Sequence, residues 1–476
     1  MLIRAATLAL GLFLATPANA QFIPTVTGPI TGGERGRPYA AAIQDLAKAG
    51  YTESEFFFEG VAQTFHPTAL QPLTTDGVWT VEAGDRKPYK TRMLVRRPAG
   101  AAKFNGTVIL EWLQATASFD KDVSWNWHHE EYLRRGYAWV GISAQHSSID
   151  ANAQDTPYKS PDVAKFRSLV QWDPARYGTL RVPHDDFAYD IFTQAARLVG
   201  PDRPGGANGA VDPLGGLTVE KIIAVGNTES AAHLVTYYNA IQPRARAIDA
   251  FLAESRYDLP ARLADGVPIP QQVHLRTDLA APIIVLNTDS NVVRHAPHRQ
   301  PDAANYRLWE VAGTSHTNAF WAPFMVAHMA RDFGIPGGTC VMPNEVPMEA
   351  VGNAAIFALN RWIRGGAPAP AARPVALFGT PPKIERDPFG NSLGGIRLRH
   401  VQVPIARYSE TPNPGCSGGG GITQPFAPAK LAQLYGSKAA WLAKFAAATA
   451  ATEKAGFLLP EDAEKILAWA KDRPEF

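Results

Sequence analysis

The sequence has little that points to nucleic acid, and little that points to a membrane-spanning fold. Its 46 Lys and Arg residues nearly balance its 44 Asp and Glu residues, and no basic run is present, so it lacks the electrostatic footprint of a nucleic-acid-binding protein. After the N-terminal segment, no apolar stretch approaches the ~20 residues that a transmembrane helix needs. Internal repeats and long disordered tracts are also absent. With 46% hydrophobic residues among 476, the chain is expected to bury a large core in one elaborated domain or two domains.

Cysteine is scarce, because Cys340 and Cys416 are the only two in the chain. An even number in an oxidising compartment allows them to pair, and the separation of their Cα atoms decides whether they do. Neither has a neighbouring histidine motif, so a metal-binding or nucleophilic role is not expected for either thiol.

The first 20 residues, "MLIRAATLALGLFLATPANA", have the three parts of a secretory signal peptide. Arg4 supplies a positive start, residues 8–14 supply a short apolar segment, and Ala18-Asn19-Ala20 supplies a cleavage signature. The apolar segment is too short to span a membrane. We therefore expect the mature chain to begin at Gln21, without a membrane anchor, in the periplasm or outside the cell.

Short apolar runs alternate with helical patterns in the middle of the chain. Such runs are typical of strands that are buried on both faces of a sheet. Strands that alternate with helices favour a mostly parallel sheet with helices on both faces. The expected strands are "GTVILEWL" (106–113), "YAWVGISAQ" (137–145), "KIIAVG" (221–226), "APIIVLNTD" (281–289) and "YRLWEVAG" (306–313), and the expected helices include "HHEEYLRRG" (128–136) and "AYDIFTQAARLVG" (188–200).

Both ends of the chain are expected to add to this α/β core. "TESEFFFEGVAQTF" (52–65) and "YKTRMLVRRP" (89–98) alternate apolar and other residues, as antiparallel strands do. We predict one domain over 21–476, with its core at about 88–370 and a C-terminal elaboration at about 371–476.

The string Gly226-x-Thr228-x-Ser230 follows a predicted buried strand and precedes a helical pattern. A nucleophile elbow needs small residues two before and two after the nucleophile, since bulk there would clash with the strand or helix. This requirement places the nucleophile at Thr228. Ser230 is the alternative nucleophile, but it would have a β-branched residue at the tight position and would already lie inside the helix.

The other members of a catalytic triad occur in the chain order of α/β-hydrolases, which is nucleophile, acid and histidine. Asp289 follows the strand "PIIVLN", and His316 follows "LWEVAG" on a loop. His316 would act as the base, and Asp289 would orient it as the acid. The oxyanion hole is expected from the backbone N–H of Glu229 and from a second N–H near Gln114.

Other polar groups are weaker candidates. Ser143 in "GISAQ" has no helical pattern directly after it. The histidine and three carboxylates of "RVPHDDFAYD" lack a second His or Cys cluster, so helix capping and contacts with arginines explain them better than a metal does. The aromatic group after residue 124 is expected in the core or in a pocket wall. These two groups are His184, Asp185, Asp186 and Asp190, and Trp125, Trp127, His128 and His129.

Long strings along nearly the whole mature chain resemble a bacterial family that is known simply as the α/β-hydrolase domain family. The resemblance implies the α/β-hydrolase fold and esterase-like chemistry. The strings are "GYTESEFFFEGVA", "YKTRMLVRRP", "FNGTVILEWLQATASFD", "RRGYAWVGISAQ", "DPARYGTL", "DIFTQAAR", "SAAHLVTYYNAI", "WEVAGTSHTNAF" and "DPFGNSLGGIRLRHVQVPIARY".

This sequence departs from the family pattern at two places. The family's elbow looks like Gly-x-Ser-Gln-Ser, so Thr228 stands where the serine is expected. The family's acid segment looks like Glu-x-Asp, where this chain has Asp289-Ser290-Asn291. If the first carboxylate is the acid, Asp289 keeps the role with a shorter side chain; if the second is the acid, Asn291 has replaced it. His316 matches the family histidine.

Three functions remain open from the sequence. The first is hydrolysis of small-molecule carboxylic esters by Thr228, or by Ser230, with His316 and Asp289. The second is a binding protein on a hydrolase fold that has lost its chemistry. The third is transfer of the acyl group to an alcohol. None of them requires a cofactor or a metal, since a triad supplies both the nucleophile and the base.

Overall fold

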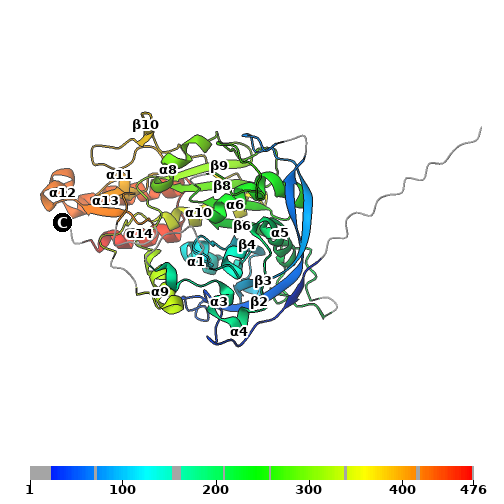
Figure 1. Ribbon diagram of the computed structural model, residues 1–476. Helices are drawn as coiled ribbons and strands as arrows, with labels where there is room; N and C mark the ends of the chain where they lie inside the picture. The colour runs from blue at the N-terminus through cyan, green and yellow to red at the C-terminus, as the bar shows by residue number, and fades with distance from the viewer. Residues whose placement is uncertain are drawn as a thin grey trace, which may run out of the picture.

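The computed structural model describes residues 23–68, 72–152, 162–206, 209–256, 259–336, 340–413 and 419–473 (Figure 1). The signal peptide expected over residues 1–20 lies outside these residues. Cys340 is disulfide-bonded, and Cys416, the only other cysteine of the sequence, lies outside the described residues. Within the described ranges, no helix combines the length and the apolarity that crossing a membrane requires.

One mixed sheet organises the described part of the chain, with the order β1-β2-β3-β5-β4-β6-β7-β8-β9. The pairs from β5 to β9 are all parallel, whereas β1, β2 and β3 are antiparallel to their neighbours. The strands are β1 (Thr25–Thr27), β2 (Tyr51–Pro67), β3 (Val81–Pro98), β4 (Thr107–Trp112), β5 (Ala138–Ile142), β6 (Lys221–Asn227), β7 (Ala250–Glu254), β8 (Ile283–Thr288) and β9 (Tyr306–Val311).

Helices cover both faces of the parallel part (Figure 1). One face carries α1 (Val123–Arg135) and α10 (Met348–Trp362), and the other carries α5 (Ala188–Val199) and α6 (Glu229–Thr236). Alternate residues of one strand enter different cores: Leu110 packs with the α5 and α6 side and Ile109 with the α1 and α10 side. The predicted α/β-hydrolase arrangement, with its uniformly apolar strands, is confirmed.

Shorter helices connect these elements and the C-terminal region adds a separate layer. Helices α12 (Pro428–Tyr435), α13 (Lys438–Lys454) and α14 (Pro460–Lys471) pack around Trp441 and Phe445 in a small core. They lie at the side of the molecule away from the β2–β3 hairpin (Figure 1). The remaining elements are α2 (His146–Ile149), α3 (Leu169–Trp172), α4 (Pro174–Tyr177), α7 (Gln242–Ala245), α8 (Asp289–His295), α9 (Ala322–Phe333), β10 (Leu377–Phe378), β11 (Lys383–Ile384), α11 (Arg399–Gln402), β12 (Ala406–Ser409) and β13 (Ile422–Pro425).

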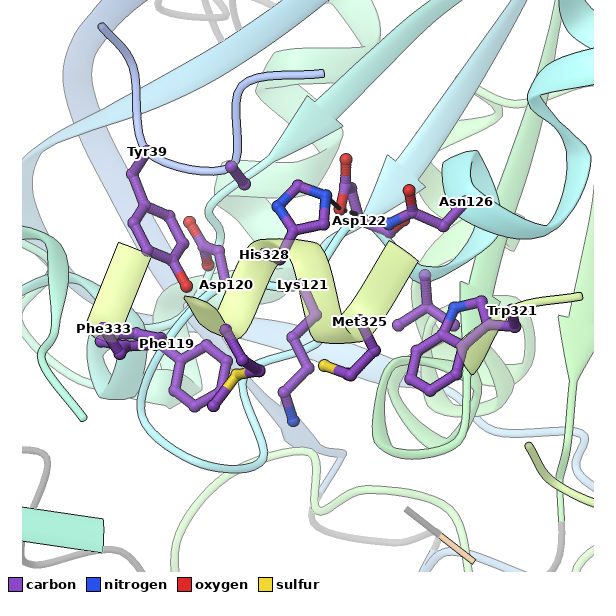
Figure 2. A pocket seen from close by; sticks show the side chains of 13 residues that line it. Tyr39, Phe119, Asp120, Lys121, Asp122, Asn126, Trp321, Met325, His328 and Phe333 are labelled. Atoms are coloured by element: carbon purple, nitrogen blue, oxygen red, sulfur yellow. Dashed lines mark hydrogen bonds and ion pairs between the residues drawn. The ribbon is translucent and has the colours of Figure 1, made fainter. Parts of the chain in front are cut away.

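Two elements that matter for the site were not predicted from the sequence. Strand β7 is only five residues long, and its letters AFLAE suit a helix as well as a strand. Helix α9 follows the predicted histidine loop and ends at Gly334, which has φ 65°. Four of its residues, Met325, His328, Met329 and Phe333, line a small pocket beside the loop that follows β4 (Figure 2).

Candidate active site

Thr228 stands at the sharp turn between β6 and α6, at the carboxyl end of a strand inside the sheet. Its backbone has φ 56° and ψ −105°, a conformation that non-glycine residues seldom adopt. A Cβ at Gly226 would lie 3.0 Å from the backbone of Ser230, so a small residue is required there. The N–H of Thr228 donates to the carbonyl of Glu254 at 2.9 Å. The backbone therefore has the strand–turn–helix form expected of a nucleophile elbow.

The hydroxyl of Thr228 is the accessible one of the two candidates. Its Oγ1 donates to Oδ1 of Asn227 at 2.5 Å and lies 3.3 Å from Nε2 of His316. Ser230, the alternative nucleophile, is completely buried, and its hydroxyl has no hydrogen-bond partner. Thr228 is partly exposed, whereas Ser230 is completely buried.

His316 lies on the loop that follows β9. Its backbone N–H donates to Oγ of Ser290 at 3.1 Å, which ties the histidine loop to the start of α8. Burial and the nearby charge of Lys121 lower the pKa of His316 to about 4. The ring is thus neutral at neutral pH and is able to accept a proton from a hydroxyl.

Asp289 is buried at the first position of α8. Its Oδ2 accepts hydrogen bonds from the N–H of Gly313, at 2.9 Å, and from the hydroxyl of Ser392. Its Oδ1 is buried without a hydrogen-bond partner, so neither oxygen is bonded to His316. Burial raises the pKa of Asp289 to about 7. The carboxyl group supports the backbone of the histidine loop, and its role as the catalytic acid stays a prediction.

Asn291, the alternative position for the acid, has a structural role. Its Oδ1 accepts hydrogen bonds from the N–H and the hydroxyl of Thr288, at 3.2 and 2.7 Å, and so caps the start of α8. The side chain is turned toward its own helix, and this contact accounts for it.

The second oxyanion donor was expected near Gln114. The N–H of Gln114 itself donates to the carbonyl of Lys121 at 3.1 Å and is therefore occupied. The next N–H, that of Ala115, faces the elbow and donates to Oε2 of Glu229 at 3.2 Å. The N–H of Glu229 lies in the first turn of α6, where N–H groups have no partner within the helix.

The side chain of Glu229 thus occupies one of the two N–H groups that could hold an oxyanion. Its Oε1 lies 3.0 Å from Nδ1 of His233 and accepts a hydrogen bond from Nε2 of Gln145 at 2.7 Å. Burial acts to raise the pKa of the Glu229 carboxyl, but these neighbours hold the pKa below its usual value. The group is therefore a carboxylate at neutral pH. Sequence reasoning considered only the backbone of Glu229, not this side chain.

The remaining candidates have structural partners. Ser143 is buried and its hydroxyl bonds to Asp120. The group of one histidine and three carboxylates does not form a single cluster. His184 lies 3.2 Å from Asp186 and 3.4 Å from Asp265, and ligand atoms of these three residues lie within 4.8 Å of one another. Asp190 instead accepts hydrogen bonds from Gln63 and Gln194, and Asp185 is largely buried.

The aromatic group on α1 is buried, as expected. Nε2 of His128 lies 2.6 Å from Oε1 of Glu254, and its Nδ1 lies 3.0 Å from Oδ1 of Asn353. The ring of Trp125 contacts Arg96, that of Trp127 contacts Trp321, and that of His129 contacts Phe320. These contacts assign the group to the interior.

A family described as "Alpha/beta hydrolase domain" matches residues 26–468. The chain belongs to the alpha/beta hydrolase domain family. No curated protein sequence matches it.

Solved structures with a similar arrangement have low identity. Methylesterase BT1017 has 11% identity and a TM-score of 0.30, with 66% of this chain and 59% of that chain covered. XC6422 from Xanthomonas campestris, an α/β serine hydrolase without a lid, has 11% identity and a TM-score of 0.28, covering 58% and 93%. A glucuronoyl esterase from Solibacter usitatus has 10% identity and a TM-score of 0.27, covering 69% and 79%.

Proposed function

We propose that this alpha/beta hydrolase cleaves carboxylic esters, with Thr228 as the nucleophile and His316 as the base. The observation that carries the proposal is the distance of 3.3 Å between Oγ1 of Thr228 and Nε2 of His316, at a turn with the backbone form of a nucleophile elbow. The low pKa of His316 keeps its ring neutral, as a base must be.

The reaction would proceed in two balanced steps. The Thr228 hydroxyl passes its proton to Nε2 of His316 while Oγ1 bonds to the ester carbonyl carbon, and the alcohol leaves after it takes the proton from His316. Water then attacks the acyl-threonine with His316 again as the base, which releases the carboxylic acid and restores the hydroxyl. The N–H of Glu229, and that of Ala115 once Glu229 moves, would stabilise the negative carbonyl oxygen. Asp289 is proposed to stabilise the imidazolium.

Hydrolysis of p-nitrophenyl butyrate by the mature chain tests this proposal. Thr228→Val keeps the branched shape without the hydroxyl, and His316→Ala removes the base; both should lower kcat by at least about a thousandfold. Ser230→Ala is the matched control, since its buried hydroxyl should not matter. Turnover that survives Thr228→Val, or that Ser230→Ala abolishes, would contradict the assignment.

A fluorophosphonate probe locates the activated hydroxyl directly. We expect one adduct on the peptide 221–241, at Thr228, and none in His316→Ala. The Thr228→Ser variant is the positive control for labelling conditions.

The second candidate is a binding protein on a hydrolase scaffold. The observation that favours it is the arrangement around the elbow: Thr228 donates to Asn227, Asp289 is not bonded to His316, and the Glu229 carboxylate holds the N–H of Ala115. This candidate predicts that ligand binding persists in His316→Ala and that neither ester turnover nor probe labelling occurs in the unmodified chain.

We also propose that the protein acts in the periplasm or outside the cell. The support is the pattern of residues 1–20 alone. Fractionation of cells that express the full chain, followed by N-terminal sequencing, should find a soluble product beginning at Gln21; a cytoplasmic product that retains Met1 would contradict export.

A further inference from the structure

The backbone of the elbow depends on the last residue of strand β7. The carbonyl of Glu254 accepts the N–H of Thr228 at 2.9 Å, one residue beyond the end of β6. Directly after Glu254, Ser255 also has a positive φ, 53°, so two non-glycine residues in an unfavourable backbone region flank this hydrogen bond. Such conformations persist only where the surrounding structure holds them. Whatever fixes Glu254 therefore also fixes the turn that carries the Thr228 hydroxyl.

The side chain of Glu254 is anchored by a histidine on the other face of the sheet from α6. Glu254 lies two residues after Leu252, which enters the core on the α1 and α10 side, and alternate residues of a strand share a face. There Oε1 of Glu254 lies 2.6 Å from Nε2 of His128 on α1, and both side chains are buried. The other carboxylate oxygen, Oε2, is buried without a hydrogen-bond partner. Loss of His128 would thus leave this buried carboxylate without a side-chain hydrogen bond among the described residues.

The hydrogen bonds around His128 determine its protonation. Its Nδ1 lies 3.0 Å from Oδ1 of Asn353 on α10, and the amide nitrogen of Asn353 donates to Asp462 at 3.1 Å. Asp462 is a carboxylate paired with both terminal nitrogens of Arg134 and can only accept, so the amide oxygen of Asn353 must face His128. Both ring nitrogens of His128 therefore face acceptors and must donate, which makes the ring an imidazolium. In agreement, although burial acts to lower the pKa of His128, the carboxylate of Glu254 raises it above its usual value.

The sequence leaves room for this ring. Gly352 lies inside α10, where glycine is less favourable than alanine. A Cβ at this position would overlap Cε1 of His128. The missing side chain at Gly352 is thus what allows the imidazolium to lie between Asn353 and Glu254.

We propose that His128 and Glu254 are positioning residues for the nucleophile: their buried ion pair fixes the end of β7, and the carbonyl of Glu254 in turn fixes the backbone of Thr228. The pair acts through the backbone and does not touch the ester. A misplacement of about 1 Å at the reacting atoms can lower a rate ~100-fold, so a shift that leaves the chain folded is enough to be seen in kcat. The proposal rests on the proposed ester hydrolysis for its kinetic readout, but the hold on the elbow can be measured without turnover.

Steady-state kinetics with p-nitrophenyl butyrate test the catalytic part. Glu254→Gln keeps the shape and an acceptor for His128 and should lower kcat about tenfold, whereas Glu254→Ala removes the anchor and should lower it about a hundredfold, with KM changed less than about twofold in both. Glu55→Gln is the matched control, because Glu55 is as buried as Glu254, each at 2% exposure, and pairs with Arg92 and Arg176 on strand β3 and helix α4. This control should lose stability in urea without a change in kcat. An unchanged kcat in Glu254→Gln, or a change in KM alone, would contradict the proposal.

Gly352→Ala tests the placement of His128 without removing any group of the network. The new methyl group must push the ring away from Glu254, so kcat should fall as it does in Glu254→Gln. If Glu254→Ala does not fold, these two variants still decide, and an unchanged kcat in both would overturn the proposal.

Amide exchange separates this proposal from the proposed hydrolysis. The N–H of Thr228, followed by NMR in protein labelled with ¹⁵N-threonine, should exchange at least about tenfold faster in Glu254→Ala. The N–H of Thr107, which donates to Oδ1 of Asn105 at 2.9 Å, is the internal reference and should keep its rate. Faster exchange at Thr228, in a protein whose unmodified form turns over no ester, would support the hold on the elbow and overturn the hydrolysis. Ester turnover with the same kcat and the same exchange in Glu254→Ala would overturn the hold and support the hydrolysis, and faster exchange with an unchanged kcat would overturn the positioning role.

Discussion

The hydroxyl of Thr228 donates to Oδ1 of its own neighbour, Asn227, at 2.5 Å. In the proposed reaction Nε2 of His316 takes this proton, and it lies farther away, at 3.3 Å. The proposed attack on an ester would require the hydroxyl hydrogen to turn from the amide oxygen to the imidazole.

Removal of this competing acceptor should accelerate the reaction. In Asn227→Ala the hydroxyl has only His316 to donate to, and a net hydrogen bond of about 1 kcal/mol corresponds to a rise in kcat of about fivefold. The measurement is single-turnover acylation with p-nitrophenyl butyrate. Asn227→Asp keeps a stronger acceptor in the same place and should slow acylation; a faster Asp variant would contradict this account.

The side chain of Glu229 should restrain catalysis in a second way. Its carboxylate holds the N–H of Ala115 and repels a negative oxygen that forms beside it. Glu229→Gln removes the charge, and an amide that keeps its oxygen on Gln145 turns an NH2 group toward Ala115 and releases that N–H. We expect kcat/KM to rise about tenfold, less than the ~100-fold that a full oxyanion donor contributes. Glu220→Gln, on the surface beside Arg364, is the matched control and should change nothing.

The sequence predicted the sheet well because each parallel strand is apolar on both faces. Leu110 and Ile109 enter different cores. A strand in the middle of the sheet is buried on both faces, so its residues form a continuous apolar run. Strand β7 was not predicted. Its five residues, AFLAE, are extended because they pair with β6 and β8, and not because of their own propensity. Local propensity is a weak guide where such pairing decides.

The site was predicted as far as chain order allows. The order of Thr228 and His316 along α/β-hydrolases predicts that they meet, and their 3.3 Å contact agrees with it. The N–H of Gln114 is paired with the carbonyl of Lys121, and the next N–H, that of Ala115, faces the side chain of Glu229. This pairing leaves no pattern in the sequence. Helix α9 did leave one, the spacing of Met325, Met329 and Phe333, and it could have been predicted.

The backbone of Thr228 should store measurable strain. A φ of 56° is unfavourable for a β-branched residue by on the order of 1–3 kcal/mol, and Thr228→Ser removes the branch while it keeps the hydroxyl. We expect this variant to be more stable to urea by about 1 kcal/mol and more active on p-nitrophenyl butyrate. Thr228→Val, which keeps the branch, should show neither gain; equal stability of the serine and threonine forms would argue against strain at the elbow.

Burial of Asp289 makes the stability of the protein depend on pH in a definite direction. Its pKa is about 7 in the folded chain and near 3.8 in the unfolded one, so between these values the folded state binds more protons. The free energy of unfolding therefore falls as pH rises from about 4 to about 7, by up to about 4 kcal/mol for this group. Asp289→Asn cannot ionise and should be more stable than the unmodified chain at pH 8, with the difference gone near pH 4.

The same substitution should reduce ester hydrolysis, because an uncharged amide stabilises the imidazolium of His316 less than a carboxylate does. Asp332→Asn provides a control of opposite sign: although burial acts to raise the pKa of Asp332, contacts with His328 and Arg331 hold it below its usual value, so this variant should be less stable at neutral pH. Urea unfolding of the unmodified chain, Asp289→Asn and Asp332→Asn at pH 4, 6 and 8 measures both effects on stability. If Asp289→Asn is less stable than the unmodified chain at pH 8, then the carboxylate of Asp289 has favourable partners in the folded chain, and burial does not raise its pKa.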